Sequence, residues 1–354
     1  MTDSLARTPN GKTRARGAGI RFAGDPGIHN AITDVAGVHV GYTTLIEDDA
    51  VRTGVTAILP RPRDDVGTPV FAGFHSLNGN GELTGTIWVE EAGILSGPIT
   101  ITNTHSCGTA RDACIKWMVR HVDGLAGWSL PVAGETFDGY LNDINGFHVT
   151  DQHVFDAIDA ARGGALEEGS VGGGTGMILY GYKGGSGTAS RRVGGYTVGA
   201  FVQANFGRRD QLTIAGVPVG RRLVQADTAE ERGSVIAIIA TDAPFMPHQL
   251  KRLARRVSIG IGRSGATSGN GSGDIFLAFS TANASAHEAE DIGNLEFVPN
   301  GRIDAFFDAV VQATDEAVIN VLFANETMTG RDGHVVEAMP REAVLAMLAE
   351  FERI

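Results

Sequence analysis

The sequence predicts a layered α/β fold in which helices cover the outer faces of β-sheets. Short apolar runs typical of strands outnumber the segments with helical periodicity, and the two kinds are interspersed along the chain. Glycine supplies 49 of the 354 residues, twice the usual share of about 7%. Because these glycines are spread among apolar runs, they indicate tight turns between strands, or backbone that lines a site, and not disorder.

The expected strands are short apolar runs. They lie at 35–42, 54–59, 70–75, 86–89, 99–103, 176–182, 197–205 and 234–241. A further strand is expected directly after Ser272, where apolar residues occupy both sets of alternating positions from Ile275 to Phe279. That pattern is typical of a strand covered on both faces.

Helices are expected where apolar residues recur at steps of three and four. These segments lie at 108–123, 150–162, 248–259, 303–324 and 341–352. Pro247 stands where a first helical turn tolerates proline. In the segment that starts at Ile303, the periodicity turns Thr314 inward. An inward hydroxyl is more often a core group bonded to the backbone than a catalytic one.

No linker divides the chain, so residues 20–354 are expected to form one domain, preceded by a disordered segment at 1–19. The N-terminus is polar and basic without the apolar core of a signal peptide, and no run of about 18 apolar residues occurs. Cys107 and Cys114 are seven residues apart on an expected helix, roughly 10 Å, which is beyond disulfide reach. We therefore expect a cytoplasmic protein with free thiols and no membrane partner.

Composition and motifs argue against several ligands. The net charge is −12 and aromatic residues make up 7%, which gives no basic, aromatic surface for nucleic acid. The glycine-rich stretches 172–176 and 184–188, on either side of a strand that ends at Lys183, lack the P-loop and dinucleotide patterns. The ten histidines are scattered without zinc-site spacing. No cofactor or metal is expected, and an activated hydroxyl is the chemistry that remains.

Ser272 is the strongest candidate for that hydroxyl. It lies between a flexible glycine-rich loop, residues 260–271, and the strand that follows. Attack of its hydroxyl on the carbonyl of Gly271 would form an ester, and hydrolysis would leave Ser272 as a new N-terminus. Its free α-amine, with an ordinary pKa of about 7.7–8.0, can then act as the base for its own hydroxyl. The same residues also fit an ordinary Asn-Gly turn.

Two further polar residues have a functional and a structural interpretation. Asn205 follows an apolar strand, and its amide is suited to stabilise an oxyanion. An asparagine beside a glycine is also a common turn former. Glu135, in the glycine-flanked stretch 134–139, carries the same ambiguity.

Several motifs taken together resemble the self-processing P1 aminopeptidases. This family includes the L-aminopeptidase/D-alanine esterase-amidases and the β-peptidyl aminopeptidases, with the nylon-oligomer hydrolases as relatives. The resemblance runs from about Thr33 to about Gly333, and its most specific block is NGSGDIFLAFSTAN at 270–283. The other matching motifs are TDVAGV at 33–38, LNGNGELTG at 77–85, ITNT at 101–104, ETFDGYLND at 135–143, VGGGTGM at 171–177, KGGSGTASR at 183–191 and QANFG at 203–207.

The resemblance implies a four-layer αββα sandwich similar to N-terminal-nucleophile hydrolases. It implies cleavage between Gly271 and Ser272 into an α chain, residues 1–271, and a β chain, residues 272–354, that assemble as a homo-oligomer of αβ units. By the same resemblance, each remaining site residue has an expected role: Asn205 stabilises the oxyanion, Glu135 holds the substrate amine, Lys183 lies near the nucleophile, and Thr314 and Glu316 orient it. Residues i and i+2 of a regular helix do not face each other. Thr314 and Glu316 can therefore share one site only if the helix is irregular or meets the site with its end.

The expected function is that of an N-terminal-serine aminopeptidase or amidase, which releases N-terminal residues from short peptides, amides or esters. Two alternatives stay open. One is acyl transfer of the ornithine acetyltransferase type, although those enzymes use threonine where this chain has Ser272. The other is an uncut, non-enzymatic binding protein in which NGSGD is only a turn.

Overall fold

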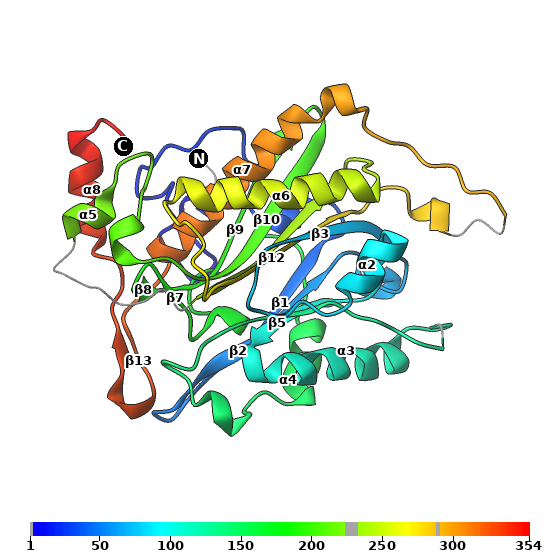
Figure 1. Ribbon diagram of the computed structural model, residues 1–354, viewed down its shortest axis with the longest axis horizontal. Helices are drawn as coiled ribbons and strands as arrows, with labels where there is room; N and C mark the ends of the chain where they lie inside the picture. The colour runs from blue at the N-terminus through cyan, green and yellow to red at the C-terminus, as the bar shows by residue number, and fades with distance from the viewer. Residues whose placement is uncertain (1–2, 126, 224–232, 288–290) are drawn as a thin grey trace.

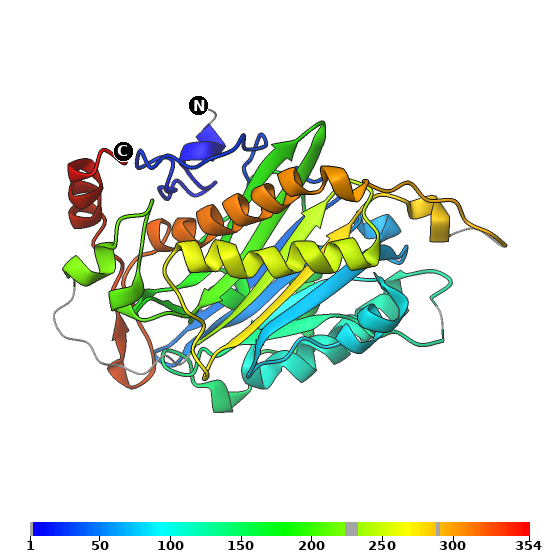
Figure 2. The same ribbon diagram turned by 45° about the horizontal axis from the view of Figure 1, so that its top comes forward.

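The molecule consists of two β-sheets packed face to face between two layers of helices (Figures 1 and 2). The computed structural model describes residues 3–125, 127–223, 233–287 and 291–354. The four-stranded sheet has the order β1 (His39–Glu47), β2 (Val51–Leu59), β5 (Ile99–Asn103) and β6 (Ala133–Thr136). The six-stranded sheet has the order β4 (Ile94–Leu95), β3 (Val70–Gly79), β12 (Gly273–Ser280), β11 (Ser234–Thr241), β10 (Tyr196–Asn205) and β9 (Gly185–Val193).

Each outer layer contains two long helices. The four-stranded sheet is covered by α3 (Cys107–His121) and α4 (Asp151–Asp159), and the six-stranded sheet by α6 (Pro247–Arg263) and α7 (Asp304–Phe323). The shorter helices are α1 (Asp3–Ala6), α2 (Thr86–Ala92), α5 (Val219–Leu223) and α8 (Arg341–Glu350), and the two-residue strands are β7 (Ile178–Leu179), β8 (Tyr182–Lys183), β13 (Met328–Thr329) and β14 (Val335–Val336). The expected αββα sandwich is confirmed.

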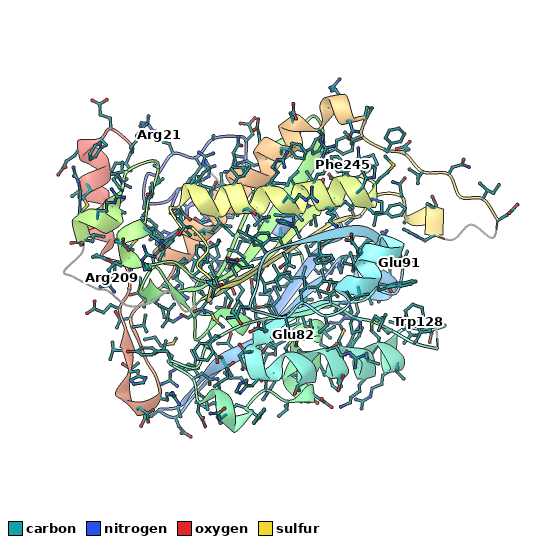
Figure 3. All side chains as sticks on the ribbon, viewed as in Figure 1. Arg21, Glu82, Glu91, Trp128, Arg209 and Phe245 are labelled. Atoms are coloured by element: carbon teal, nitrogen blue, oxygen red, sulfur yellow. The ribbon has the colours of Figure 1, made fainter. Side chains whose placement is uncertain are left out.

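Three apolar cores separate the four layers. The first lies between the six-stranded sheet and helices α6 and α7. The second fills the space between the two sheets, where Ile58 and Ile101 of one sheet face a cluster with Ile236 and Leu277 of the other. The third lies between the four-stranded sheet and helices α3 and α4. Side chains occupy all of these spaces (Figure 3), and β12 is buried along its whole length because helices cover one face and a sheet covers the other.

Strand β12 determines the position of the site. It pairs in parallel with β11 and antiparallel with β3, in a register that joins Gly273 to Ser234 and to Gly79. Ser234 pairs in turn with Asn205 at the end of β10. The six-stranded sheet therefore brings Ser272, Asn205 and the last residues of β3 together at one end of its strands.

The N-terminal segment corrects one expectation. The sequence predicts disorder at 1–19, whereas residues 3–19 pack against the body of the protein. Two buried ion pairs explain this order: Arg14 Nε lies 2.7 Å from Glu168 Oε2, and Arg16 Nε lies 2.6 Å from Glu316 Oε1. Ala15 between them is fully buried.

Four local predictions of secondary structure are wrong. Residues 176–182, expected as one strand, form β7 and β8 around a tight turn, and residues 260–263, expected as loop, are the last turn of α6. Residues 86–89, expected as a strand, form helix α2, which is bounded by the left-handed glycines Gly85 and Gly93. Residues 184–188, expected as a turn, begin strand β9. A side chain at Gly187 would place its Cβ 2.2 Å from the backbone oxygen of Ala317. Glycine is needed there for the close approach of α7, so its presence does not signal a turn.

Two other expectations concern the cysteines and membranes. Cys107 and Cys114 are both buried and free, as the sequence predicts. Among the described residues, no helix is both long enough and apolar enough to cross a membrane.

Candidate active site

Ser272 lies where an exposed loop enters the central strand. The loop runs from the end of α6 to the start of β12 (Figure 1). Asn270 and Gly271 are exposed, whereas Ser272 is fully buried. Its backbone N–H donates to the oxygen of Gly269 at 2.9 Å. The peptide bond before Ser272 therefore joins a solvent-exposed residue to a fixed one.

The hydroxyl of Ser272 is oriented by a carboxylate two residues further along the chain. Ser272 Oγ donates to Asp274 Oδ1 at 2.6 Å. Asn78, opposite Asp274 in β3, donates through Nδ2 to Asp274 Oδ2 at 3.3 Å and to the backbone oxygens of Ser268 and Gly269 at 2.8 and 3.1 Å. Asn78 thus links the carboxylate to the loop that precedes Ser272.

Asn80 contacts the peptide bond between Gly271 and Ser272. Its Nδ2 donates to the carbonyl oxygen of Gly271 at 2.9 Å. This is the oxygen that would become negatively charged if Ser272 attacked the Gly271 carbonyl. Asn80 is therefore placed as an oxyanion donor for that reaction.

Glu135 is a buried carboxylate beside the start of β12. Its Oε1 accepts the backbone N–H of Glu82 at 2.9 Å, and its Oε2 accepts the hydroxyl of Thr104. A methyl group at Gly81 would lie 3.0 Å from Glu135 Oε1 and 3.2 Å from Gly273 Cα. Burial raises the pKa of Glu135 despite these two donors. Among the described residues, no lysine or arginine forms an ion pair with it.

Asn205 is held by the backbone around the site. Its Oδ1 accepts the N–H of Ile178 at 2.8 Å, and its Nδ2 donates to the oxygen of Phe137 at 2.9 Å. The N–H of Phe137 donates to Ser234 Oγ at 3.3 Å. Asn205 therefore lies at the end of its strand, as expected, and makes the bonds of a structural residue.

Lys183 lies at the same end of the six-stranded sheet, but its ammonium group binds backbone oxygens. The side chain is fully buried, and Nζ donates to the oxygens of Met177 and Gly184 at 2.9 and 2.7 Å. Burial, together with the charge of Lys12, lowers the pKa of Lys183 well below its ordinary value. No bond joins Lys183 to Ser272 within the part of the chain that the structure describes.

Thr314 and Glu316 are not brought to Ser272. Helix α7 is continuous, and Thr314 packs against α6, where a Cβ on Gly260 would lie 2.6 Å from Thr314 Cβ. Glu316 instead accepts from Arg191 Nη2 at 2.6 Å and from Arg16 Nε at 2.6 Å. Arg191 stands at the end of the six-stranded sheet opposite Ser272, because its register runs through Val198 and Thr241 to Ser280.

These placements separate the predicted residues into two groups. Ser272, Asn205 and Lys183 lie at one end of the strands of the six-stranded sheet, and Glu135 of β6 lies close to Ser272. The hydroxyl of Thr314 and the carboxylate of Glu316 have other neighbours, since side chains two apart on a regular helix point to different faces.

Comparison with known proteins identifies the family. Residues 30–336 match Peptidase family S58. The chain belongs to this peptidase family. The beta-peptidyl aminopeptidase BapA of Sphingosinicella microcystinivorans is 48% identical over 96% of this chain and 93% of that protein. The protein of the same name from Sphingosinicella xenopeptidilytica is 43% identical over 96% and 92%.

Solved structures agree with the family assignment. The L-aminopeptidase D-Ala-esterase/amidase from Ochrobactrum anthropi, a variant of the Ntn hydrolase fold, has a TM-score of 0.91 and 49% identity, with coverage of 96% of this chain and 99% of that one. A Burkholderia beta-aminopeptidase has a TM-score of 0.89 and 46% identity, with coverage of 96% and 99%. The expected family and fold are confirmed, and these relatives support an aminopeptidase or amidase function over acyl transfer or simple binding.

Three residues of this S58 peptidase near the bond between Gly271 and Ser272 have no role in the sequence prediction: Asn78, Asn80 and Asp274. Two of them lie in the LNGNGELTG motif and one in NGSGD. The alternation of side chains along a strand was an available signal, because it places residues 272 and 274 on one face. The contact with Asn78 depends on the register between β3 and β12, which the sequence does not show.

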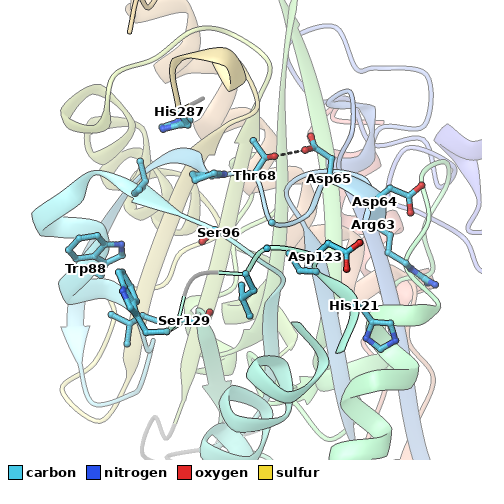
Figure 4. A pocket seen from close by; sticks show the side chains of 18 residues that line it. Arg63, Asp64, Asp65, Thr68, Trp88, Ser96, His121, Asp123, Ser129 and His287 are labelled. Carbon is cyan, nitrogen blue, oxygen red and sulfur yellow. Dashed lines mark hydrogen bonds between the residues drawn. The ribbon is translucent and has the colours of Figure 1, made fainter. Parts of the chain in front are cut away.

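A separate pocket of about 750 Å³ lies between α2, the end of α3 and the segment after Arg63 (Figure 4). Trp88, His121, Trp128 and His287 contribute to its lining. None of the predicted site residues lines it. Elsewhere too, the described residues contain no group of three or more His, Cys, Asp or Glu side chains placed to hold a metal ion.

Proposed function

We propose that this S58 peptidase cuts its own chain between Gly271 and Ser272 and then removes N-terminal residues from short peptides, amides or esters. One observation carries the proposal. A buried carboxylate without a lysine or arginine partner among the described residues, Glu135, lies close to a serine whose hydroxyl donates to a second carboxylate, Asp274. A substrate with a free ammonium group supplies the missing cation.

Glu135 explains why the reaction is confined to the first residue of a substrate. Burying a carboxylate without a cation is unfavourable, and the raised pKa of Glu135 is consistent with that cost. An ammonium group bound at Glu135 offsets the free-energy cost of burying this carboxylate. A substrate amine held there places the first carbonyl, a few bonds away, near Ser272.

Cleavage has to come first, because Ser272 is fully buried in the uncut chain. Separation of Gly271 exposes the hydroxyl and creates an α-amine with an ordinary pKa of about 7.7–8.0, suited to act as the general base at neutral pH. Ser272 Oγ then attacks the substrate carbonyl and forms an acyl-enzyme that water resolves. Asn205, with Lys183 near it, is the proposed oxyanion donor of this turnover.

Intact mass and amino-terminal sequencing test the first half of the proposal. The purified protein should appear as residues 1–271 and 272–354, and the smaller chain should begin Ser-Gly-Asp-Ile. Ser272→Ala should remain one chain of 37.1 kDa. Cutting of the alanine variant at the same bond would assign the cut to an outside protease.

A panel of aminoacyl p-nitroanilides tests the second half. The cut enzyme should release p-nitroaniline from substrates with a free amine and not from their N-acetylated counterparts. Equal rates on the two sets would show that no ammonium group is recognised and would remove Glu135 from the site.

We also propose that the cut enzyme is a cytoplasmic, closed homo-oligomer of αβ units. The resemblance of the sequence motifs to self-processing aminopeptidases is the basis for this proposal. Closed symmetric assemblies are the usual form of soluble oligomers. Sedimentation equilibrium should give a mass that is a whole multiple of 37.1 kDa, and a mass of one unit would contradict the proposal.

A further inference from the structure

We propose that the uncut chain contains its own catalytic pair for self-cleavage, in which Asp274 is the general base and Asn80 is the oxyanion donor. This inference rests on the proposed cut between Gly271 and Ser272. It concerns only the reaction that precedes peptide turnover. Neither residue belongs to the set that the resemblance implies.

The uncut chain needs a base other than the α-amine. Before cleavage the nitrogen of Ser272 is part of a peptide bond, so it is not basic and cannot accept the hydroxyl proton. Turnover and self-cleavage therefore start with different proton acceptors. Lys183, although buried nearby, donates to two backbone oxygens and has no bond to Ser272.

Asp274 has the geometry of that acceptor. Its Oδ1 lies 2.6 Å from Ser272 Oγ, which is the length expected for a hydroxyl that donates to a carboxylate. Its Oδ2 accepts from Asn78 Nδ2 at 3.3 Å, so the carboxylate has a fixed orientation. Asp274 is 1% exposed and Ser272 is 0% exposed, which keeps bulk water away from the proton transfer.

Asn80 has the geometry of the oxyanion donor. The distance of 2.9 Å from Nδ2 to the oxygen of Gly271 lies within the range of known oxyanion holes. Asn205, the donor proposed for turnover, bonds instead to Phe137 and Ile178. Of these two asparagines, only Asn80 contacts the scissile carbonyl.

The end of β3 holds both catalytic groups in place. Asn78 lies opposite Asp274 in the pairing of β3 with β12 and also binds the oxygens of Ser268 and Gly269. A Cβ on Gly273 would lie 2.2 Å from the backbone oxygen of Asn80. Glycine at 273 therefore allows the segment with Asn80 to pack directly against the residue after the nucleophile.

The proposed reaction balances as an N-to-O acyl shift followed by hydrolysis. The Ser272 Oγ proton moves to Asp274 as Oγ bonds to the Gly271 carbonyl carbon, and Asn80 stabilises the resulting oxyanion. The intermediate collapses, the bond from that carbon to the Ser272 nitrogen breaks, and Asp274 returns the proton to the leaving amine. Water then hydrolyses the ester between Gly271 and Ser272, which yields a carboxylate and a free hydroxyl. Gly271 is exposed, so water has access to this ester.

Freshly synthesised chain provides the test, because the uncut form can be followed from the moment it is made. Wild type, Asp274→Asn and Asn80→Ala are produced by cell-free synthesis, and the appearance of residues 272–354 is timed by denaturing gel and mass spectrometry. We expect cleavage about 100-fold slower or more in each variant, the usual effect of losing a general base or an oxyanion donor. Exposed Asn294→Ala is the control for loss of an asparagine and should cut at the wild-type rate.

A second variant separates catalysis from folding. Asp274→Ala leaves space for a small carboxylate, so added formate should restore cleavage in proportion to its concentration, whereas chloride at equal ionic strength should not. Cooperative thermal unfolding checks that the uncut variants are folded. Wild-type cleavage rates in Asp274→Asn or Asn80→Ala, or a folded Asp274→Ala that formate does not rescue, would overturn the proposed pair. A wild-type chain that never cuts, or a Ser272→Ala chain that does, would instead overturn the proposed function.

Discussion

Two buried glutamates at opposite ends of the six-stranded sheet have opposite electrostatic surroundings. Glu316 binds Arg16, Arg191 and the side-chain amide of Asn30, with contacts of 2.6 to 2.8 Å. Among the described residues, Glu135 accepts from a backbone N–H and the hydroxyl of Thr104 and forms no ion pair with a lysine or arginine. Burial would raise the pKa of both, but the arginines outweigh it at Glu316 and lower the pKa there, whereas the pKa of Glu135 stays raised. A buried carboxylate that already has its cations supports the fold, and one that lacks them is available for a ligand.

Glu316→Gln should give the largest effect, and the effect should be on stability. The change leaves the buried guanidinium of Arg191 and that of Arg16 without their carboxylate, so the free energy of unfolding should fall by about 3–5 kcal/mol. Urea denaturation in the uncut Ser272→Ala background measures it. Glu326→Gln, which removes an exposed pair with Arg341, is the matched control and should cost under about 1 kcal/mol. Unchanged stability, together with lost turnover when Glu316→Gln is made in the chain that retains Ser272, would place Glu316 in the active site after all.

Asp138 extends the comparison to a third buried acid. Burial raises its pKa to about 7, although Thr53 and Asn142 donate to it. Between about pH 4 and pH 7 the native state therefore keeps a proton that the unfolded state has released, and stability falls as pH rises through this window. Asp138→Asn should remove that pH dependence. The free energy of unfolding of the variant minus that of its parent should therefore increase by about 1.4 kcal/mol for each unit by which the pH is raised.

Denaturation of both proteins at pH 5, 6 and 7 provides the measurement. The Ser272→Ala background again keeps the chain uncut. Parallel stability profiles would mean that Asp138 is ionised in the native state at these pH values and that its surroundings stabilise the charge.

Glu135→Gln should affect substrate binding more than stability. Charged hydrogen bonds contribute about 1.5–3 kcal/mol, so the KM for substrates with a free amine should rise by about 10- to 100-fold, with a smaller change in kcat. Glu82→Gln is the matched control, because it removes an exposed neighbouring charge and keeps the backbone N–H that binds Glu135. An equal rise in KM in both variants would indicate a diffuse charge effect and no specific pairing.

Thr314→Val should have the smallest effect. The hydroxyl is buried and has no hydrogen-bond partner among the described residues, so its removal should leave stability unchanged or raise it by up to about 1 kcal/mol. Cleavage and turnover should stay within about twofold of wild type. Thr314→Ser keeps the hydroxyl and loses a packed methyl group, at a cost of about 1 kcal/mol. Loss of activity in the valine variant alone would restore the catalytic role that the resemblance implies.

Much of the fold could be predicted because its long elements obey simple periodicities. The strands at 99–103 and 234–241 match β5 and β11 to the residue, and the helix expected at 303–324 is α7 within one residue at each end. Prediction failed where packing overrides composition. The β-prone residues of 86–89 lie in a short helix between two left-handed glycines, and Ile87 is 83% exposed.

The site was predicted in part, for a similar reason. Ser272 is recognisable because it lies between a glycine-rich loop and an apolar strand, and both features are local in sequence. Asn78 and Asp274 meet only through the register of β3 with β12. The partners of Glu316 come from residues 16, 30 and 191, and nothing in the sequence between them indicates that they meet.

The position of β12 has a consequence for the lifetime of the mature enzyme. After the proposed cut, β12 begins the smaller chain but still lies between β3 and β11, which both belong to the larger one. The native contacts that hold the sheet together survive the cut, whereas any refolding requires two separate chains to find each other and so depends on their concentration. A precursor that folds as one chain thus becomes a metastable assembly, and its lifetime is set by the rate at which it unfolds.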